Sequence, residues 1–396
     1  MTNAPRAEDY APPSWLPGQS RLAMIIGLVG AAACVVGYLS APERFFQSYL
    51  IGYLLWFGIG MGCLGLLMLN HMTGGAWGIV MRRVFEAGSR TVPVLLVLFV
   101  PIVFGMNSLY SWMDPVVMAN NAFIAAKEPY LNENFFLLRA GIYFVVWMVL
   151  ALVLNQMSRR QDENSTPDLS RRLQGFSGAG TLIFVLTITF ASFDWLMSLD
   201  PVWFSSIYGF WLVITQALTT FCFIILVGRR LMTTKPLQGV ITASHYDDYG
   251  KLLFAFNMLW IYVTFSQWVI IWSGNLPEEI PWYLARREGG YWEWSLVLFI
   301  IHFFLPFFLL LSRRLRRNPA ALGAVAVLLI VADWFDIYWH AMPTWHATLS
   351  LHWLDLAAPI AIGGLWVSAF FWQLQRRTIL AVGDPRVKEA MGDAHS

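Results

Sequence analysis

The chain has 396 residues, of which 58% are hydrophobic and only 13% are charged, and its mean hydropathy is +0.57. Soluble globular chains carry about 25% charged residues, so this composition excludes a water-soluble protein. The 26 basic and 24 acidic residues nearly cancel. Net charge therefore gives no reason to expect a nucleic acid or another polyanion as partner.

Ten apolar stretches are long enough to cross a bilayer, which takes about 20 residues in a helix. In chain order they are residues 22–39, 46–70, 91–113, 133–157, 178–197, 203–227, 249–273, 290–311, 319–341 and 355–375. The connections between them are short, and a lipid-exposed strand would leave backbone groups without hydrogen bonds. The sequence therefore predicts an all-α integral membrane protein with ten transmembrane helices.

The distribution of Lys and Arg predicts the orientation. With the N-terminus inside, all but five of the 26 basic residues fall in segments on the inner side. The five are Arg44, Lys127, Arg139, Arg286 and Arg287. Because basic residues concentrate in cytoplasmic loops, we expect both termini in the cytoplasm, with a leader at residues 1–20, a transmembrane domain at 21–377 and a tail at 378–396.

The spacing of the spans indicates an internal repeat. Spans two to four and spans six to eight start at a nearly constant offset, and the pairs Asp194-Trp195 and Asp333-Trp334 close the fifth and ninth spans. Because many membrane folds contain repeats, we expect one four-helix bundle at about 46–197 and another at about 203–341. The first and tenth helices would be peripheral. Coincidence of spacing is the alternative.

Polar side chains within spans are costly and mark candidate functional groups. His302 is the only histidine near the centre of a span. It cannot by itself supply the two facing axial ligands of a haem b, and would be either a hydrogen-bonded packing residue or a proton carrier. Asp333, Asp336 and His340 are spaced three and four residues apart, on one helical face.

Further polar residues extend this series toward both surfaces. Asp194 lies near the same outer surface as Asp333 and Asp336, where these carboxylates would either cap helices against interfacial water or form an exit for protons. The candidates on the inner side are His71, Glu86, Asp247, Asp248 and Lys251, and those toward mid-depth are Asn257, Gln267 and His302.

Other chemistry has little support in the sequence. Cys34, Cys63 and Cys222 lie in apolar spans without a metal-binding or redox spacing, and His346 and His352 form only a weak candidate for zinc. No nucleophile elbow, phosphate-binding loop or dinucleotide fingerprint occurs in a suitable context. We therefore expect no catalytic residue, cofactor or metal in this chain. The many Trp residues at the outer span ends would anchor helices at the headgroups or form a docking surface.

Four segments carry a more specific pattern: PIVFGMNSLYSWMDP (101–115), FDWLMSLDPVWFSSIYG (193–209), the stretch 254–292 with NLPEEIPWYLARR, and IHFFLPFFLLLSR (301–313). They resemble the ActF subunit of alternative complex III, a bacterial quinol:electron acceptor oxidoreductase, over about residues 45–375. The resemblance implies the ten-helix fold of the sister subunit ActC and of NrfD-like membrane proteins, in the bacterial inner membrane. It also implies partner subunits that carry iron-sulfur clusters and c-type haems, with quinol as the substrate of the complex.

The resemblance implies a structural role and a possible proton path for this chain, in a respiratory or photosynthetic electron-transfer complex. A quinone- or quinol-binding role is the alternative. The family pattern has a histidine-rich segment before Leu109-Tyr110, whereas this chain has Asn107 and Ser108, so no proton or quinol role carries over to that position. A free-standing transporter is a third possibility, but matching Gly/Pro interruptions in both halves are missing from the sequence.

Overall fold

The computed structural model describes residues 7–392. The first six residues of the predicted leader, with Arg6, and the last four of the predicted tail lie outside the described residues. Within 7–392 the chain is helical without a β-strand, and Gln238 and Ile241 form one isolated bridge. The predicted all-helical class is confirmed.

Nine helical segments within residues 7–392 are long and apolar enough to cross a membrane, and a bent pair makes a tenth if it is counted as one span. The nine are α1 (Leu16–Ser40), α2 (Pro42–Thr73), α9 (Glu133–Glu163), α10 (Pro167–Trp195), α11 (Tyr208–Leu231), α12 (Ala243–Gly274), the run of α14 (Tyr291–Leu298), η4 (Phe299–Phe304) and α15 (Leu305–Leu311), α17 (Pro319–Ala341) and α18 (Leu354–Leu374). The chain therefore has the architecture of a multi-pass membrane protein.

The bent pair replaces the predicted span at 91–113. Helices α4 (Arg82–Ser89) and α5 (Val92–Phe104) meet at 41°, next to Pro93, which has no backbone N–H to donate. The charges of α4 made it resemble a loop in the sequence, but all of its residues are buried. Helix α5 ends before Gly105, which has low helix propensity.

Short helices connect the long ones. They are η1 (Ala7–Tyr10), α3 (Ala76–Ile79), α6 (Met106–Leu109), η2 (Ser111–Met113), α7 (Pro115–Asn120), α8 (Ala122–Ala125), η3 (Met197–Leu199), α13 (Ile280–Leu284), α16 (Arg313–Arg316), η5 (Met342–Thr344) and α19 (Val387–Gly392).

Side-chain caps define where several long helices begin. The side-chain oxygens of Asn132, Thr166 and Asn318 accept backbone N–H groups at the first turns of α9, α10 and α17. Each cap satisfies N–H groups that have no partner within the helix. These three polar residues thus end the preceding connections and start the helices.

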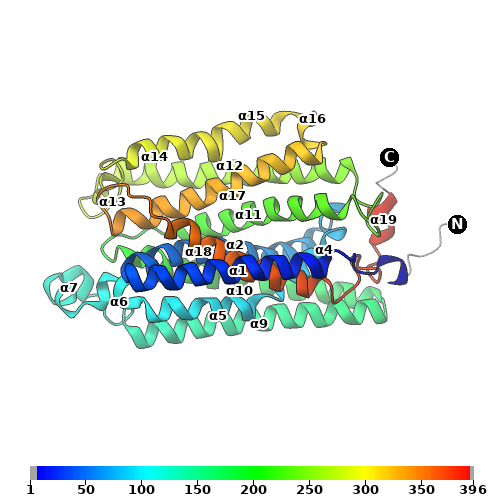
Figure 1. Ribbon diagram of the computed structural model, residues 1–396, viewed down its shortest axis with the longest axis horizontal. Helices are drawn as coiled ribbons and strands as arrows, with labels where there is room; N and C mark the ends of the chain where they lie inside the picture. The colour runs from blue at the N-terminus through cyan, green and yellow to red at the C-terminus, as the bar shows by residue number, and fades with distance from the viewer. Residues whose placement is uncertain (1–6, 393–396) are drawn as a thin grey trace.

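Helices α2 and α11 form the centre of the molecule (Figure 1). In their most apolar stretches 89% of α2 residues and 78% of α11 residues are buried, against 28% in α1. Helix α2 packs against α18, α4, α10 and α5, and α11 packs against α17, α12, α10 and α2. The other long helices surround this central pair.

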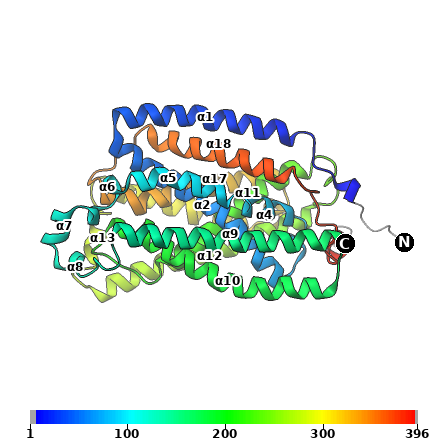
Figure 2. The same ribbon diagram turned by 90° about the horizontal axis from the view of Figure 1, so that it is seen from below.

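Helix α1 lies at the edge of the molecule, beside α18 (Figure 2). Small residues allow the two backbones to approach closely, as at many helix contacts in membranes. A Cβ atom built on Gly364 would lie 2.3 Å from the backbone nitrogen of Gly27, and one on Gly30 would lie 2.8 Å from Ala361. A larger side chain at Gly30 or at Gly364 would therefore push α1 and α18 apart.

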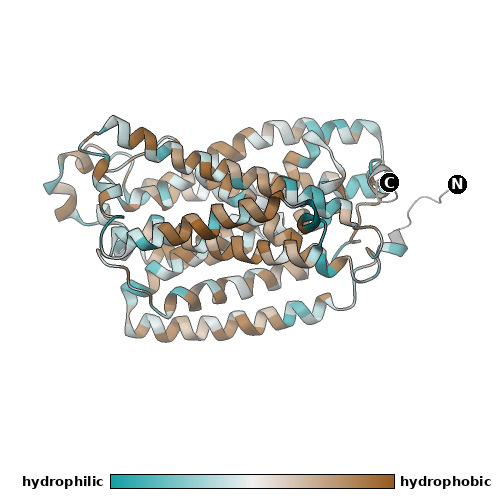
Figure 3. Cartoon of the chain, turned by 90° about the horizontal axis from the view of Figure 1, so that it is seen from above, coloured by the Kyte–Doolittle hydropathy of each residue, from teal (hydrophilic) through white to brown (hydrophobic). Residues whose placement is uncertain are grey.

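The start of α1 and the end of α18 lie at the same end of the molecule, which we call the terminal end (Figure 1). There the backbone N–H of Ile379 donates to the carbonyl oxygen of Tyr10 at 2.9 Å. Helices α7 and α13 lie at the opposite end. Hydrophilic residues gather toward the two ends and hydrophobic residues occupy the middle (Figure 3), as expected of a protein that crosses a bilayer.

Candidate functional site

Three buried polar side chains meet between α17 and the α14–α15 segment. His302, Asp333 and Asp336 each place one nitrogen or oxygen atom so that the three atoms lie within 4.8 Å of one another. None of the three residues is more than 1% exposed. The two aspartates share a face of α17 because they are three residues apart. We call these three residues the buried cluster.

Aromatic residues from neighbouring helices hold the buried cluster. The indole N–H groups of Trp211 and Trp260 donate to Oδ2 of Asp336 at 3.0 and 2.8 Å. The Trp260 ring also stacks on His302, with 3.7 Å between ring centroids. The Trp211 ring stacks in the same way on His340, at 4.0 Å. Helices α11 and α12 therefore fix the position of Asp336 and of both histidines.

His340 belongs to the same surroundings. Its Nδ1 lies 3.2 Å from Oδ1 of Asp336 but hydrogen-bonds to the Asp336 backbone oxygen at 2.9 Å. The predicted grouping of Asp333, Asp336 and His340 on one face agrees with this geometry. The alternative of helix caps in interfacial water is wrong for Asp333 and Asp336, because both are buried inside the protein.

Several atoms of the buried cluster have no hydrogen-bond partner among the described residues. They are both ring nitrogens of His302, Oδ1 of Asp333 and Oδ1 of Asp336. His302 packs through its stacking on Trp260, and neither of its ring nitrogens makes the hydrogen bond expected of a hydrogen-bonded packing residue. Since unpaired polar atoms are rare in protein interiors, the cluster retains capacity for protons, water or an ion.

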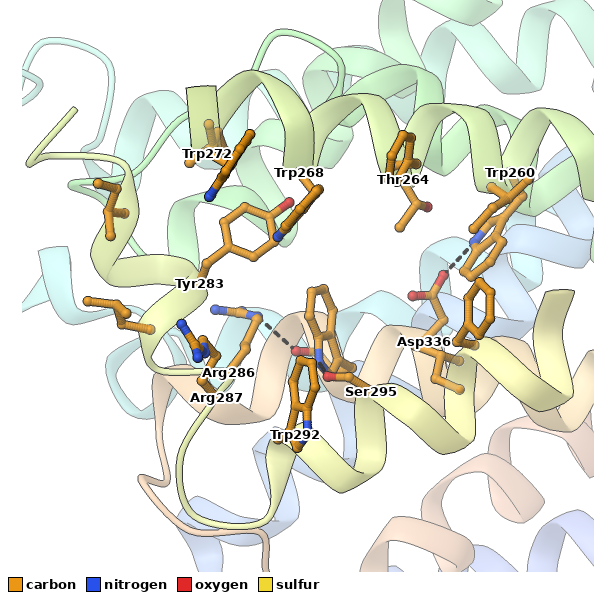
Figure 4. Close-up of a pocket in the computed structure, with 18 of the residues that line it drawn as sticks. Trp260, Thr264, Trp268, Trp272, Tyr283, Arg286, Arg287, Trp292, Ser295 and Asp336 are labelled. Carbon is orange, nitrogen blue, oxygen red and sulfur yellow. Dashed lines mark hydrogen bonds between the residues drawn. The ribbon is translucent and has the colours of Figure 1, made fainter. Parts of the chain in front are cut away.

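A cavity of about 560 Å³ opens beside the cluster, and Asp336 lines it. Aromatic side chains from α12, α13, α14 and α17 form most of its wall: Trp260, Trp268, Trp272, Tyr283, Trp292 and Trp339. Asp336 and Trp260 lie toward one end, whereas Tyr283 and Arg286 lie toward the other (Figure 4). The cavity could accommodate a flat apolar ligand with a polar group directed at Asp336.

Arg286 fixes the outer wall of this cavity. Its guanidinium donates to the carbonyl oxygens of Trp282, Trp339 and His340 at 2.7, 3.1 and 2.6 Å. Burial lowers the pKa of Arg286 to about 9, so the group stays protonated at neutral pH. In the sequence this residue was only one basic residue in a loop, because its backbone partners are distant in the chain.

Asp194 belongs to a different site. Its carboxylate accepts two hydrogen bonds from the Arg139 guanidinium, both at 2.9 Å, and one from the Tyr143 hydroxyl at 2.8 Å. Its partners lie on α9, and none of them contacts Asp336. The carboxylates that the sequence placed together near the outer surface therefore lie in two separate sites. Asp194 is buried and paired with Arg139, and is not a helix cap in interfacial water.

The candidates at the terminal end are also in separate places. Nδ1 of His71 contacts the Ser177 hydroxyl at 3.0 Å, between α2 and α10. Asp247 pairs with Arg316 at 2.9 Å and with Lys251 at 3.1 Å. Lys251 also binds Asp248 at 3.0 Å.

Polar residues on α12 connect the cluster with the opposite end. Asn257, Trp260, Thr264 and Gln267 recur every three or four residues and so share one face. The side-chain atoms of Asn257 and the Thr264 hydroxyl are buried without a hydrogen-bond partner among the described residues. Gln267 lies 3.3 Å from both the Ser205 and the Tyr283 hydroxyls. Of this face, Thr264 and the role of Trp260 were not predicted.

Glu86, an inner-side candidate in the sequence, lies at the terminal end in an ion network whose partners were not predicted. Glu86 accepts hydrogen bonds from Arg82 at 3.0 Å, Arg83 at 2.6 Å, Ser158 at 2.5 Å and Arg377 at 3.4 Å. The spacing of Arg82, Arg83 and Glu86 at three and four residues was the signal that could have revealed it.

Asp384 extends the ion network from the C-terminal segment. It binds Arg82 at 2.7 Å and Arg386 at 2.9 Å. Burial alone would raise the pKa of the Asp384 carboxyl, but the hydrogen bonds from Arg386 and the charge of Arg82 hold it at about 2. Asp384 is thus ionised at every physiological pH and ties the C-terminal segment to α4.

Comparison of the whole chain with protein-family models and with curated proteins gives no match.

Proposed function

We propose that the chain is an ActF-type integral membrane subunit of alternative complex III, with a structural role, a proton path and no redox centre of its own. The resemblance of its most specific segments supports this assignment. The segment DWLMSLDP contains Asp194, which pairs with Arg139, and NLPEEIPWYLARR contains Tyr283 and Arg286 of the cavity wall. Both segments thus form buried polar contacts, which generic apolar sequence does not require.

The buried cluster is the observation that supports proton transfer. Two carboxylates and an imidazole within 4.8 Å cannot all be charged in a low-dielectric interior without a large energetic cost. Such groups titrate as a unit and exchange protons among themselves. His302, Asp333 and Asp336 would therefore be the proton-holding station of the path, with His340 next to it.

The path would continue from the cluster along the polar face of α12 toward the opposite end. Thr264 and Gln267 offer hydrogen-bonding groups there, and Gln267 reaches the hydroxyl groups of Ser205 and Tyr283. Between Asn257 and Lys251, toward the terminal end, the five residues 252–256 are all apolar. Water molecules would have to carry protons across this stretch, because its side chains offer no hydrogen-bonding group. Beyond it, Asp247 is paired with Arg316 and Lys251.

We further propose ten spans in two bundles, with α1 and α18 peripheral and both termini in the cytoplasm of a bacterial inner membrane. Counting α4 and α5 as one span gives an even number, in agreement with the common position of the start of α1 and the end of α18. Helix α5 packs against α2 and α9, and α10 packs against both. Similarly, α12 packs against α11, α15 and α17.

The partner subunits of the chain would be ActC and the subunits with iron-sulfur clusters and c-type haems.

The cavity favours a second candidate function, a quinone- or quinol-binding site. Its aromatic wall would stack on a quinone ring, and Asp336 and Tyr283 offer hydrogen-bonding groups at its two ends. A free-standing transporter is less favoured. The bent third segment, α4 with α5, corresponds to α12 in the expected repeat, and α12 is continuous.

One preparation tests the assignment and the proton path. The tagged chain is purified from its native membrane, and copurifying proteins are identified by mass spectrometry; subunits with iron-sulfur and haem c motifs are expected. In proteoliposomes, quinol-driven proton release should fall in the D333N and D336N complexes while electron transfer persists. Asp168→Asn, at an exposed pair with Arg172, is the control.

Two results would contradict the proposal. Wild-type proton release from both cluster variants would exclude the path through α17. Purification of the chain alone, with transport activity of its own, would replace the complex subunit by the transporter. Quinone density in the aromatic cavity in a substrate-bound map would select the second candidate function.

A further inference from the structure

The buried cluster has the donor set of a metal site. One atom from each of His302, Asp333 and Asp336 lies within 4.8 Å of the other two. The atoms without a hydrogen-bond partner are the ring nitrogens of His302 and one carboxylate oxygen of each aspartate. All three side chains are at least 99% buried, so these atoms face the protein interior rather than solvent. Oδ1 of Asp336 also lies 3.2 Å from Nδ1 of His340.

Charge favours a divalent cation. Two ionised carboxylates and a neutral imidazole carry a charge of −2, which a divalent ion cancels and a monovalent ion does not. A net charge in the membrane interior is costly, so this neutrality matters more here than at a surface. A donor set of one nitrogen and two oxygens suits zinc and related transition metals better than calcium or magnesium, which prefer oxygen alone.

The distances are compatible with such an ion. Tetrahedral bonds of about 2.1 Å place ligand atoms about 3.4 Å apart. The cluster atoms are at most 4.8 Å apart, so small side-chain rotations suffice to close the site. Oδ2 of Asp336 accepts the Trp211 and Trp260 N–H groups, and these would orient the ligating carboxylate as outer partners do in known metal sites.

An ion could reach the site through the cavity. Asp336 lines the cavity of about 560 Å³ and also belongs to the cluster. Ser295 and Tyr283 also line this cavity (Figure 4). A fourth ligand, such as water, could approach Asp336 from this side.

We propose that His302, Asp333 and Asp336 bind one divalent transition-metal cation within the membrane domain. Protons and the metal compete for the same atoms, so binding releases protons and weakens as the pH falls. The metal site shares its three residues with the proposed proton station but does not rest on the place of the chain in a respiratory complex. Metal content is measured without turnover, so the metal site and the proton path can fail separately.

The experiment uses the full chain, purified with its partners where they copurify, and stripped with a chelator. Zinc is added, excess zinc is removed on a chelating column, and zinc per chain is measured by mass spectrometry. We expect one tightly held zinc in the wild type and at least about tenfold weaker binding in Asp333→Asn and in His302→Gln. Asp168→Asn and His346→Gln are the matched controls and should bind zinc as the wild type does.

A second measurement separates ligand loss from misfolding. Zinc should raise the melting temperature of the wild type and of the controls, because it binds only the folded state. It should leave the melting temperature of folded Asp333→Asn unchanged. Cobalt gives a further readout, a visible absorption band that disappears in the cluster variants. Equal zinc retention in the wild type and both cluster variants, or equal loss in the controls, would overturn the proposal.

Discussion

Two groups of buried ionisable residues in this molecule are built in opposite ways. Around Glu86, each carboxylate has arginine partners: Arg82 and Arg83 bind Glu86, and Arg82 also binds Asp384. In the buried cluster, no arginine or lysine contacts Asp333 or Asp336 among the described residues, and several atoms have no partner. The carboxylates of the first group are all paired with arginine, although Arg82 and Arg83 each keep one nitrogen without a partner, whereas the carboxylates of the second group have no arginine or lysine partner among the described residues.

This difference separates structural from functional charge. A paired buried ion resists any change of protonation, because removal of one partner leaves the other charge uncompensated. An unpaired carboxylate near an imidazole can gain or lose a proton or an ion at smaller cost. We therefore expect substitutions at the network to reduce stability, and substitutions at the cluster to change binding and proton transfer instead.

The largest expected effect is that of Glu86→Gln. The substitution leaves the charges of Arg82 and Arg83 buried without their carboxylate, which we expect to destabilise the protein by about 3 to 5 kcal/mol. Thermal unfolding of the purified chain in detergent measures this loss. Glu163→Gln, at an exposed pair with Arg159, should change stability by less than about 0.5 kcal/mol. Similar stabilities for the two variants would show that the network is not structural.

Asp384 provides a pH test of the same network. The pKa of Asp384 in the folded protein is about 2, below the ordinary value of 3.8. Its ionised carboxylate therefore stabilises the fold above about pH 4, and this stabilisation is lost as the pH falls through about 2. The shift corresponds to about 2 kcal/mol. The free energy of unfolding, measured between pH 5 and pH 2, should therefore fall more for the wild type than for Asp384→Asn. Parallel curves would mean that Asp384 does not hold the C-terminal segment to α4.

Trp260→Phe examines the partners of the cluster. It removes the N–H donated to Asp336 and retains an aromatic ring for stacking on His302. Because Trp211 still donates to the same oxygen, we expect the free energy of unfolding to fall by only about 1.5 kcal/mol. Proton release or zinc affinity should change more than the melting temperature does. Trp268→Phe, in the cavity wall, is the control, and an equal effect of both would refute a specific role of the Trp260 N–H.

Asp333→Asn should have the smallest effect on stability. Its carboxylate has no ion-pair partner, so removing the charge costs about 0 kcal/mol or stabilises the protein slightly. The expected melting temperature is equal to or above that of the wild type, in contrast to Glu86→Gln. A large loss of stability would show that Asp333 is held by contacts as Glu86 is, and would remove the distinction between the two groups.

The sequence was informative where one local pattern was sufficient. Apolar length predicted the long helices, and the spacing of Asp333, Asp336 and His340 predicted their common face. It could not place His302 beside Asp333, since these residues meet only through the packing of two helices. It also missed α4, because Arg82 and Glu86 look like loop residues until Asp384 and Arg377, about 300 positions later in the chain, are seen to contact them.

His302 lies in η4, a π-helical turn between α14 and α15. A π-helical turn accommodates one more residue than an α-helical turn and is common at functional sites. Deleting one residue of this turn, such as Ile301, would restore a regular α-helix and change the direction in which His302 projects. The meeting of His302 with the aspartates thus depends on the length of the chain as well as on its chemistry, and a one-codon deletion could abolish it while every polar residue remains present.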